Sequence, residues 1–502
     1  MKADIIEVAK RRGFFWKSSD IYQGISGFYD YGPIGSLLKR RFESLWRRYF
    51  LGLDDNFHEI ESSLIMPENV FAASGHLQSF VDPIVRCSKC GHAERADHIL
   101  EDILKESFEG LKAGEMMAII KKHGIKCSKC KGAFSEVGTL NMMFPINVGT
   151  GNDVKKAYLI PETAQGAYVN FKACFDVMRR RLPLGLAIVG RAFRNEISPR
   201  QGLIRMREFT QAELQIFFDP EMIGSHERFD SIANYKLKLF PVKNRGNQKT
   251  EEIQAKEALS FLPKFYVYHM ARVQQFYLDI LRLPKEKFRF RELAEEERAF
   301  YNKYHWDIEI FLESTGWKEI AGLHYRTDHD LAGHEKTSKT SMHVNIDGKG
   351  ILPHVLEISM GVDRNIYMLL ELGYEEEKER TVIRFPRLLS PMDAGVFPLV
   401  NKDGLPEKAA EIKSLLEAAG FKAFYDDGGS IGRRYRRIDE IGVPAGITID
   451  HDTLKSNTVT LRDRDTMRQI RVNIRDLSLT MKHFLEGEDM GKLGTIVETK
   501  QG

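Results

Sequence analysis

The chain has 502 residues, a formal net charge of +3, 42% hydrophobic residues and 29% charged residues. This length exceeds that of one ordinary domain and predicts two or three, with enough apolar side chains for a sizeable core. The small net charge excludes a uniformly basic nucleic-acid-binding protein, so contact with nucleic acid would need a local basic patch.

The N-terminal segment contains no apolar stretch of the kind found in signal peptides, and no later run is long enough to span a bilayer. We therefore expect a cytoplasmic protein without membrane contact. Residues 34–50 carry apolar side chains at helical spacing after Gly32 and Pro33, which predicts an amphipathic helix. The run FHEIESSLIMP, residues 57–67, then predicts a strand that stops at its proline.

Two CSKC motifs follow, and their four cysteines predict a closed structural Zn²⁺ site because four thiolates suit tetrahedral zinc. The intervening stretch is longer than in a short zinc ribbon and predicts a helical excursion between the two knuckles. His92 is an alternative ligand or simply a knuckle residue. The expected zinc ligands are Cys87, Cys90, Cys127 and Cys130.

Residues 138–218 alternate short apolar runs with Gly and Pro turns, which predicts a large antiparallel sheet. Residues 219–303 are rich in Lys and Glu, and we expect them to be mostly helical and to lie outside the sheet. WDIEIFLESTGWKEIAGL, residues 306–323, returns to a strand pattern. HVLEISMGVDRNIYMLLEL, residues 354–372, predicts a strand, a glycine turn and an apolar helix.

Residues 190–218 form a hairpin pattern that is unusually rich in arginine. Side chains two apart on a strand share a face, so one face gathers arginines, a lone Phe and polar or acidic groups. Arginine binds phosphate oxygens with a planar fork, and an aromatic ring can stack on a purine. This pattern favours nucleotide binding, although a solvated, salt-bridged hairpin is the alternative. The residues of that face are Arg194, Glu196, Arg205, Arg207, Phe209, Gln211, Glu213 and Gln215.

A composition break lies near residue 390, and residues 394–450 then alternate strand and helix patterns. This order predicts a small α/β domain with a mostly parallel sheet. The helix SIGRRYRRIDEIG places basic groups around an aromatic ring, which suits single-stranded RNA. The alternative is a solvated helix face whose apolar side packs on the sheet. The candidate RNA-binding residues are Arg433, Arg434, Tyr435 and Arg436.

Three segments in order resemble the motifs of the class II aminoacyl-tRNA synthetases. The helix at residues 33–50 with its following strand is similar to motif 1, FRNEISPRQGLIRMREFTQAE to motif 2, and EISMGVDR to motif 3. GFYDYGPIG and PETAQG add a resemblance to the glycyl-tRNA synthetases of the archaeal and eukaryotic dimeric type. The resemblance covers nearly the whole chain, except for residues 219 to about 300.

The resemblance implies an α+β catalytic core on a large antiparallel sheet with flanking helices. A zinc insert and a C-terminal anticodon-binding α/β domain complete the expected fold. The expected boundaries are 1–86 and 131–388 for the core, 87–130 for the insert and 389–502 for the C-terminal domain. An insertion at about 219–303 interrupts the core, and motif 1 implies a homodimer.

The resemblance also implies a two-step reaction, in which glycine is activated by ATP and then transferred to the 3′ end of tRNA(Gly). Arg194, Arg205 and Arg364 are the expected catalytic groups, which contact the ATP phosphates. Phe209 and Arg364 should stack on the adenine, with Glu196 near it and Arg207 in a supporting role. The full expected ATP-binding set is Arg194, Glu196, Arg205, Arg207, Phe209, Glu319 and Arg364.

Glycine offers only an ammonium group and a carboxylate for recognition, so converging acids suit it and their bulk excludes a methyl group. The expected glycine-binding residues are Glu162, Arg194, Glu213, Glu357 and Ser359. Glu319 and Glu357 are candidate Mg²⁺ ligands, because carboxylates and substrate phosphates suit this ion.

Two alternatives remain open from the residues alone. One is a class II synthetase for another amino acid, and the other is a non-catalytic RNA-binding paralogue. The segment GLHYRTDHDL departs from the Ala-Asp-Arg expected before its final Asp-Leu, so no role is expected for His324 or Tyr325.

Overall fold

The protein was studied as a computed structural model, which describes residues 5–104, 111–197, 199, 202–299 and 301–497. The chain divides into two compact units. The larger comprises Lys17–Tyr29 and Trp46–Asn365, and the smaller comprises Met1–Trp16, Asp30–Leu45 and Ile366–Gly502. The division passes through helices α2 (Pro33–Phe50) and α11 (Val362–Gly373). The domain boundaries expected from the motifs stay predictions.

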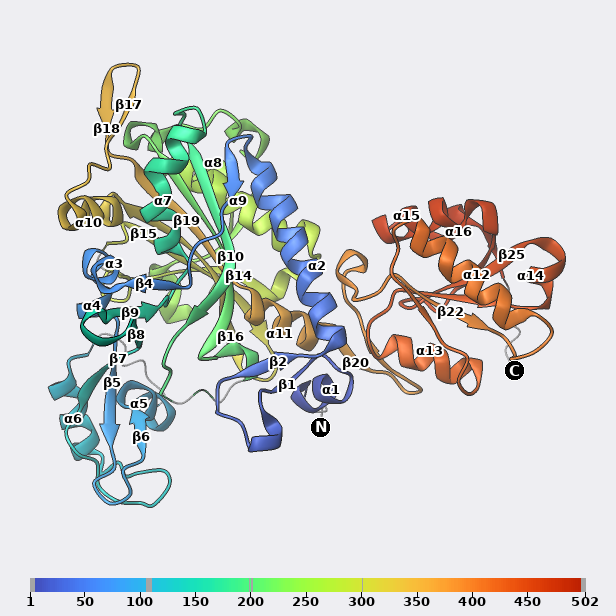
Figure 1. Cartoon of the computed structure of the whole chain (residues 1–502), viewed down its shortest axis with the longest axis horizontal. Helices are drawn as coiled ribbons and strands as arrows, with labels where there is room; N and C mark the ends of the chain where they lie inside the picture. The colour runs from blue at the N-terminus through green and yellow to red at the C-terminus, as the bar shows by residue number, and fades with distance from the viewer. Residues whose placement is uncertain (1–4, 105–110, 198, 200–201, 300, 498–502) are drawn as a thin grey trace. The chain divides into compact units, whose positions relative to one another are not determined.

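The larger unit is built on the expected large sheet, which has nine strands and is mostly antiparallel (Figure 1). Only the β10–β3 and β12–β14 pairs among them run parallel. The strands in spatial order are β13 (Glu251–Gln254), β12 (Lys236–Phe240), β14 (Phe288–Glu292), β15 (Tyr304–Leu312), β16 (Gly316–Thr327), β19 (His354–Gly361), β11 (Glu208–Phe218), β10 (Leu184–Phe193) and β3 (Phe57–Glu59).

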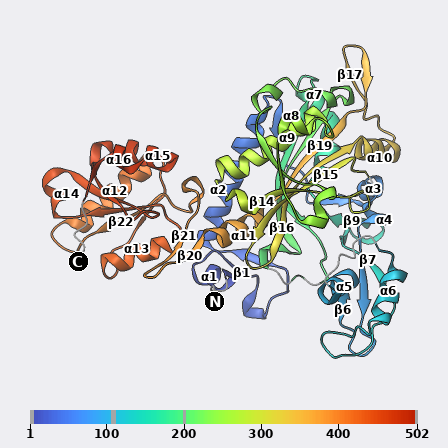
Figure 2. The same cartoon turned by 180° about the vertical axis from the view of Figure 1, so that it is seen from behind.

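Helices cover both faces of this sheet. On one face, α7 (Ala164–Val177) buries Phe171, which stacks on Phe217 of β11 with ring centroids 4.4 Å apart. On the opposite face, α9 (Lys264–Gln275) packs Phe265 on Phe218 of the same strand, also at 4.4 Å (Figure 2). Successive residues of β11 thus point to opposite faces, as the pleat of a strand requires.

Residues 219–303 contradict the expected helical composition. They do contain α9, but they also contribute β12, β13 and β14, which form one edge of the main sheet. The strand segments KLKLF and FRFRE alternate charged and apolar residues, and this period of two is a strand signal. The high Lys and Glu content masked it, because those residues occupy the outward positions while Leu237 and Leu239 are buried.

The cysteine-containing insert is a small α/β unit within the larger body. Its sheet pairs β5 (Val81–Arg86) with β6 (Ala93–Arg95) and β7 (Gly138–Asn141). Helices α5 (Ala96–Leu104) and α6 (Ala113–Lys122) pack on it through a core that includes Val85, Leu100, Met116 and Ile120. A second small sheet joins β4 (Ile65–Pro67), β9 (Lys155–Leu159) and β8 (Phe144–Val148).

The smaller unit contains the expected C-terminal α/β fold, but most of its strand pairs are antiparallel, which corrects the expectation of a mostly parallel sheet. Its main sheet has the order β23-β22-β24-β25-β26-β27, with β22 parallel to both neighbours and the remaining pairs antiparallel. These strands are β22 (Ala394–Pro398), β23 (Ala423–Tyr425), β24 (Ala445–Ile449), β25 (Thr458–Asp463), β26 (Gln469–Asn473) and β27 (Thr495–Ile496). Helices α12 (Leu405–Ala418), α13 (Ile431–Asp439) and α15 (Leu477–Glu486) cover the sheet.

Across the described residues, no helix combines the length and the apolar character needed to cross a membrane.

Candidate active site

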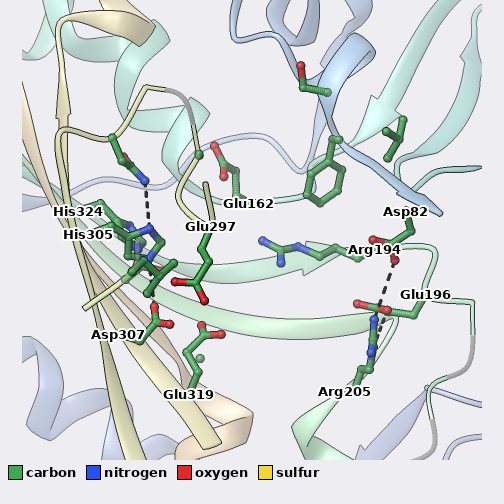
Figure 3. A pocket seen from close by; sticks show the side chains of 18 of the residues that line it. Asp82, Glu162, Arg194, Glu196, Arg205, Glu297, His305, Asp307, Glu319 and His324 are labelled. Atoms are coloured by element: carbon green, nitrogen blue, oxygen red, sulfur yellow. Dashed lines mark hydrogen bonds and ion pairs between the residues drawn. The ribbon is translucent and has the colours of Figure 1, made fainter. Parts of the chain in front are cut away.

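A cavity of about 1020 Å³ lies in the larger unit, and its wall includes residues of β11, β16 and β19. It is lined by every residue expected to bind ATP or glycine except Arg207. Figure 3 shows Arg194 reaching into this space, with Glu196 and Arg205 to one side and a histidine cluster to the other. The expected residues that line the cavity are Glu162, Arg194, Glu196, Arg205, Phe209, Glu213, Glu319, Glu357, Ser359 and Arg364.

Arg194 is held directly after the end of β10. Its Nε donates to the Pro161 carbonyl at 3.0 Å, and its guanidinium lies 5.3 Å from the ring centroid of Phe209 and 5.2 Å from that of Phe80. Cation–π contacts on two rings fix the plane of the guanidinium. The remaining nitrogens are thereby oriented for an anion.

Arg205 connects the hairpin to the insert. Its Nε donates to Glu196 Oε2 at 2.6 Å, and its Nη1 lies 3.2–3.3 Å from the ring nitrogens of His98 on α5. Asp82 Oδ2 is 3.9 Å from Arg205 Nη2. Burial raises the pKa of Asp82 to about 6, although Arg95 opposes the shift. The insert therefore supplies part of the wall around this arginine.

Arg207 does not line the cavity, so the structure places it apart from the other residues expected to bind ATP. Its Nε and Nη2 donate to the Glu196 carbonyl at 3.0 and 2.7 Å, and its Nη1 donates to the Ser26 carbonyl at 2.8 Å. The expected strand alternation fails here because β11 begins only at Glu208. Arg207 instead fixes the backbone beneath Glu196.

Glu213 lies at the centre of the expected glycine pocket and is 3% exposed. Its Oε1 accepts from Ser359 Oγ and its Oε2 accepts from Thr163 Oγ1, both at 2.6 Å. Burial, together with the charges of Glu357 and Glu162, raises the pKa of Glu213 to about 7. No described cation forms an ion pair with this carboxylate within 4.0 Å.

The other two pocket acids have cationic partners. Glu162 lies 3.5 Å from His76 Nε2 and 3.7 Å from Arg326 Nη2. Burial alone would raise its pKa, but these cations hold the pKa of Glu162 well below its usual range. Glu357 Oε2 lies 3.2 Å from Arg326 Nη1 and 2.5 Å from His324 Nδ1, and its pKa is likewise lowered against the effect of burial.

Arg326 and His324 line the cavity and Asp330 binds Arg326, and the sequence interpretation left all three without a role. Asp330 fixes the Arg326 guanidinium through two bonds of 2.9 and 3.1 Å. A period-two reading of β16, like the one applied to the arginine hairpin, places Gly322, His324 and Arg326 on one face. The sequence alone therefore shows that these side chains share a face. It does not show that β19, with Glu357, is the neighbouring strand.

Arg364 and Glu319 meet at the exposed side of the cavity. Arg364 Nη1 lies 3.0 Å from Glu319 Oε1, and its Nε donates to the Ile204 carbonyl at 3.1 Å. Glu357 of β19 pairs with His324 of β16, and His324 lies five residues after Glu319 on the same strand. The α-carbons of Glu319 and Glu357 are therefore roughly 15 Å apart along the strands. This separation is unfavourable for one ion held by both side chains, and the expectation that Glu319 and Glu357 are Mg²⁺ ligands stays a prediction.

The four cysteines of the insert converge as expected. Cys87 and Cys130 sulfurs are 3.4 Å apart, Cys90 and Cys127 sulfurs are 3.8 Å apart, and all four lie within 4.8 Å of one another. Tetrahedral Zn–S bonds of about 2.3 Å give sulfur separations of about 3.8 Å, so the set fits zinc. His92 is 3.2 Å from Glu94 and does not belong to this cluster.

The candidate RNA-binding helix α13 separates into two kinds of side chain. Arg433 and Arg436 are exposed. Arg434 is 2% exposed and donates to the carbonyls of Pro398, Asp427 and Gly429, so it supports the fold instead of facing RNA. Tyr435 also turns inward, with its hydroxyl 2.6 Å from Thr448 Oγ1.

The period of the helix explains why Arg434 and Tyr435 face inward. Arg434 lies four residues before the buried Ile438, and Tyr435 lies three residues before it, so both share its inward side.

Comparison with known proteins identifies two family models along the chain. The tRNA synthetase class II core domain (G, H, P, S and T) matches residues 150–372, and the anticodon binding domain matches residues 393–483. The glycine–tRNA ligase of Pyrococcus horikoshii is 40% identical over 96% of this chain and 98% of its own length. That of Aeropyrum pernix is also 40% identical, over 98% of each chain. The Methanococcus vannielii enzyme is 37% identical over 93% of this chain and 97% of its own.

Proposed function

The chain belongs to the glycine–tRNA ligases, and from this membership we propose how its own residues activate glycine and transfer it to tRNA(Gly). It is an ATP-dependent aminoacyl-tRNA ligase with a class II core. The observation that carries the residue assignment is one cavity whose lining includes three carboxylates, Glu162, Glu213 and Glu357, together with Arg194 and Arg364.

Activation joins the glycine carboxylate to the α-phosphate of ATP. An oxygen of glycine forms a bond to phosphorus, the bond to the β-phosphate oxygen breaks, and pyrophosphate leaves with that electron pair. The developing negative charge on the phosphoryl oxygens needs oriented positive groups. Arg194 is suited to this role because two aromatic rings and the Pro161 carbonyl fix its guanidinium.

The nucleotide is held by the groups around Arg194. Phe209 offers a ring for the adenine, and Arg205 and Arg364 supply charge for the triphosphate. Arg205 would exchange its bond with Glu196 for a phosphate oxygen, which leaves Glu196 available to the base or ribose. Mg²⁺ accompanying ATP would neutralise phosphate charge, and Glu319 beside Arg364 is the carboxylate of this chain suited to hold it.

Recognition of the glycine ammonium falls mainly to Glu213. Glu162 and Glu357 are already paired with His76, Arg326 and His324, whereas Glu213 is bonded only to hydroxyl groups. An arriving ammonium would therefore gain most from Glu213 and would keep it ionised. The surrounding buried acids restrict space at the α-carbon, which disfavours alanine and larger amino acids by steric clash.

Transfer completes the reaction when a terminal ribose hydroxyl of tRNA(Gly) attacks the carbonyl carbon of the adenylate and AMP leaves. Arg433 and Arg436 on α13 are proposed to contact the tRNA, since both are exposed and cationic. The enzyme is further proposed to act as a cytoplasmic homodimer with a structural Zn²⁺ held by the four cysteines.

Amino-acid-dependent exchange of labelled pyrophosphate into ATP tests this assignment. Glycine should stimulate exchange, while alanine and serine should not. Stimulation by another amino acid alone would overturn the glycine assignment, and no exchange with any amino acid would favour a non-catalytic paralogue. Light scattering of the purified protein tests the homodimer.

A further inference from the structure

A second cluster of metal-type ligands lies in the cavity wall, apart from the cysteine site. His305, Asp307 and His324 each offer one ligand atom, and these atoms all lie within 4.8 Å of one another. All three line the cavity, and Figure 3 shows them gathered on the side away from Arg205. The roles proposed above do not use His305 or Asp307.

The strand pairing of β15 and β16 creates this cluster. His305 and Asp307 are two residues apart on β15 and so share a face, and His324 is directly opposite His305 on β16. The rings of His305 and His324 have centroids 4.1 Å apart and cross at 80°. Edge-to-face rings of this kind leave both imidazoles able to direct a nitrogen toward a common point.

Gly322 provides the space for His324. It is the residue directly opposite Asp307, and a β-carbon added there would overlap the His324 ring at Nε2. The absence of a side chain lets the imidazole lie over Gly322, with Nε2 on the side of Asp307. A glycine at this one position therefore keeps a ligand nitrogen next to a carboxylate.

The spacing suits a small divalent ion. His305 Nε2 and Asp307 Oδ1 are 3.0 Å apart. Zn–N and Zn–O bonds of about 2.0–2.2 Å place tetrahedral ligand atoms roughly 3.3–3.6 Å apart, so side-chain movements of about 1 Å would close the cluster. Two imidazoles and one carboxylate favour zinc and neighbouring transition metals over Mg²⁺ or Ca²⁺, which prefer oxygen ligands alone.

The outer partners match those of metal-bound histidines, which usually give their second ring N–H to an acceptor. His324 Nδ1 lies 2.5 Å from Glu357 Oε2, and this leaves Nε2 for the cluster. His305 Nδ1 lies 3.4 Å from Asn302 Nδ2. Asn302 Oδ1 is buried and has no hydrogen-bond partner among the described residues. Rotating that amide by 180° lets Oδ1 accept from His305 Nδ1–H and satisfies both groups.

The charges around the cluster are mixed. Arg291 Nη1 is 3.5 Å from Asp307 Oδ2, which occupies one oxygen and leaves Oδ1 toward His305. Glu319 interacts electrostatically with both histidines and adds negative potential that favours a cation.

We propose that His305, Asp307 and His324 bind a divalent transition-metal ion of the Zn²⁺ class, with a coordination position open to the cavity for water or a substrate oxygen. Through the His324–Glu357 bond, occupancy of this site acts on the amino-acid pocket. The site is additional to the zinc held by the four cysteines and does not depend on the ligase assignment.

Metal stoichiometry tests the proposal without relying on activity. Purified protein is dialysed against Zn²⁺ and, separately, Co²⁺, and metal per chain is measured. The wild type should bind two ions, and the double variant His305→Gln, His324→Gln should bind one. The second Co²⁺ ion should add ligand-field absorption without thiolate charge-transfer bands, because its ligands contain no sulfur.

Two further variants sharpen the result. His451→Gln changes an exposed histidine elsewhere and should retain both ions. Asn302→Leu removes an outer partner and should weaken binding at the second site by about 10- to 100-fold.

One ion per wild-type chain, or two in the double variant with an unchanged circular dichroism spectrum, would overturn the proposal. A cluster that serves only to position Glu357 would give the first of these outcomes. Glycine-dependent exchange, measured on the same samples, reports separately on the proposed function.

Discussion

Ser359 of β19 stands directly opposite Glu213 of β11, and its hydroxyl donates to Glu213 Oε1 at 2.6 Å. The centre of the proposed glycine pocket is therefore set by the register of two neighbouring strands. Thr163, just before α7, closes the other side of the same carboxylate. Rigid sheet positions are well suited to distinguish glycine from a substrate one methyl group larger.

Glu213→Gln should weaken glycine recognition while keeping the shape of the side chain. Loss of a buried charge interaction costs about 2 kcal/mol or more, so kcat/KM for glycine should fall roughly 30-fold or more. The KM for ATP should change little. Pyrophosphate exchange at varied glycine and ATP concentrations measures both, and an equal rise in the two KM values would contradict the assignment.

Glycine binding should also depend on pH through Glu213. Because the pKa of Glu213 is raised to about 7, the carboxylate that is proposed to bind the ammonium group is lost as the pH falls through 7. The KM for glycine should rise about tenfold for each pH unit below that value in the wild type. The Glu213→Gln variant should lack this dependence, so parallel pH profiles for the two proteins would refute the role.

Glu213 should also make stability depend on pH, in the opposite direction to its effect on glycine binding. A carboxyl whose pKa is higher in the folded state binds protons more tightly there, so the unfolding free energy falls as the pH rises through that window. For Glu213 the window runs from about 4.5 to about 7. Urea unfolding measures the unfolding free energy of both proteins. The value for Glu213→Gln minus that of the wild type should be larger at pH 8 than at pH 5. A difference that does not change with pH would argue against the raised pKa.

Arg326→Ala should strongly destabilise the larger unit. It would leave the buried Asp330 and Glu357 and the partly buried Glu162 without their common cation, and breaking a buried pair in this way costs about 3–5 kcal/mol. Arg191→Ala, which removes an exposed pair with Glu208, should cost less than about 1 kcal/mol. Urea unfolding of both variants provides the comparison, and similar losses would count against the buried network.

Removal of the zinc that we propose for the cysteine site should affect ATP more than glycine. Cys127→Ser should release the metal and loosen the insert, whose α5 carries His98 against Arg205. The KM for ATP should then rise while exchange persists. Cys174→Ser, a half-buried cysteine outside the cluster, should keep both zinc and the ATP KM. Metal analysis and exchange kinetics on the two variants decide this.

Arg194→Ala and Arg207→Ala should separate chemistry from positioning. Arg194→Ala should reduce exchange by about 100-fold or more, with little change in the melting temperature, because its charge acts on the transition state. Arg207→Ala should lower the melting temperature through the lost bonds to Ser26 and Glu196 and reduce exchange less. A reversed order of the two exchange rates would invalidate the division.

Local patterns predicted the parts of the fold and site that depend on one element. The alternation in residues 208–218 indicated which side chains share a face, and the two CSKC motifs indicated the cysteine cluster. The register between strands that are distant in the sequence could not be predicted from local patterns. The pairing of His324 with Glu357 and the separation of Glu319 from Glu357 therefore emerged only from the structure.

Composition misled where charged residues occupy outward strand positions, as in β12. It also misled at Arg434, where a cation satisfies three backbone carbonyls inside the C-terminal fold. In both places a charged residue was assumed to mark the surface. The inward partners of these residues lie on other elements, which a linear pattern does not reveal.

Arg205 is shared between Glu196 of the hairpin region and His98 of the insert. Binding of the ATP triphosphate to Arg205, as proposed, would compete with both contacts. By thermodynamic linkage, any ligand that moves α5 changes ATP affinity by the same factor by which ATP changes the affinity for that ligand. The ATP affinity measured in solution therefore reports whether α5 of the insert has moved relative to Arg205.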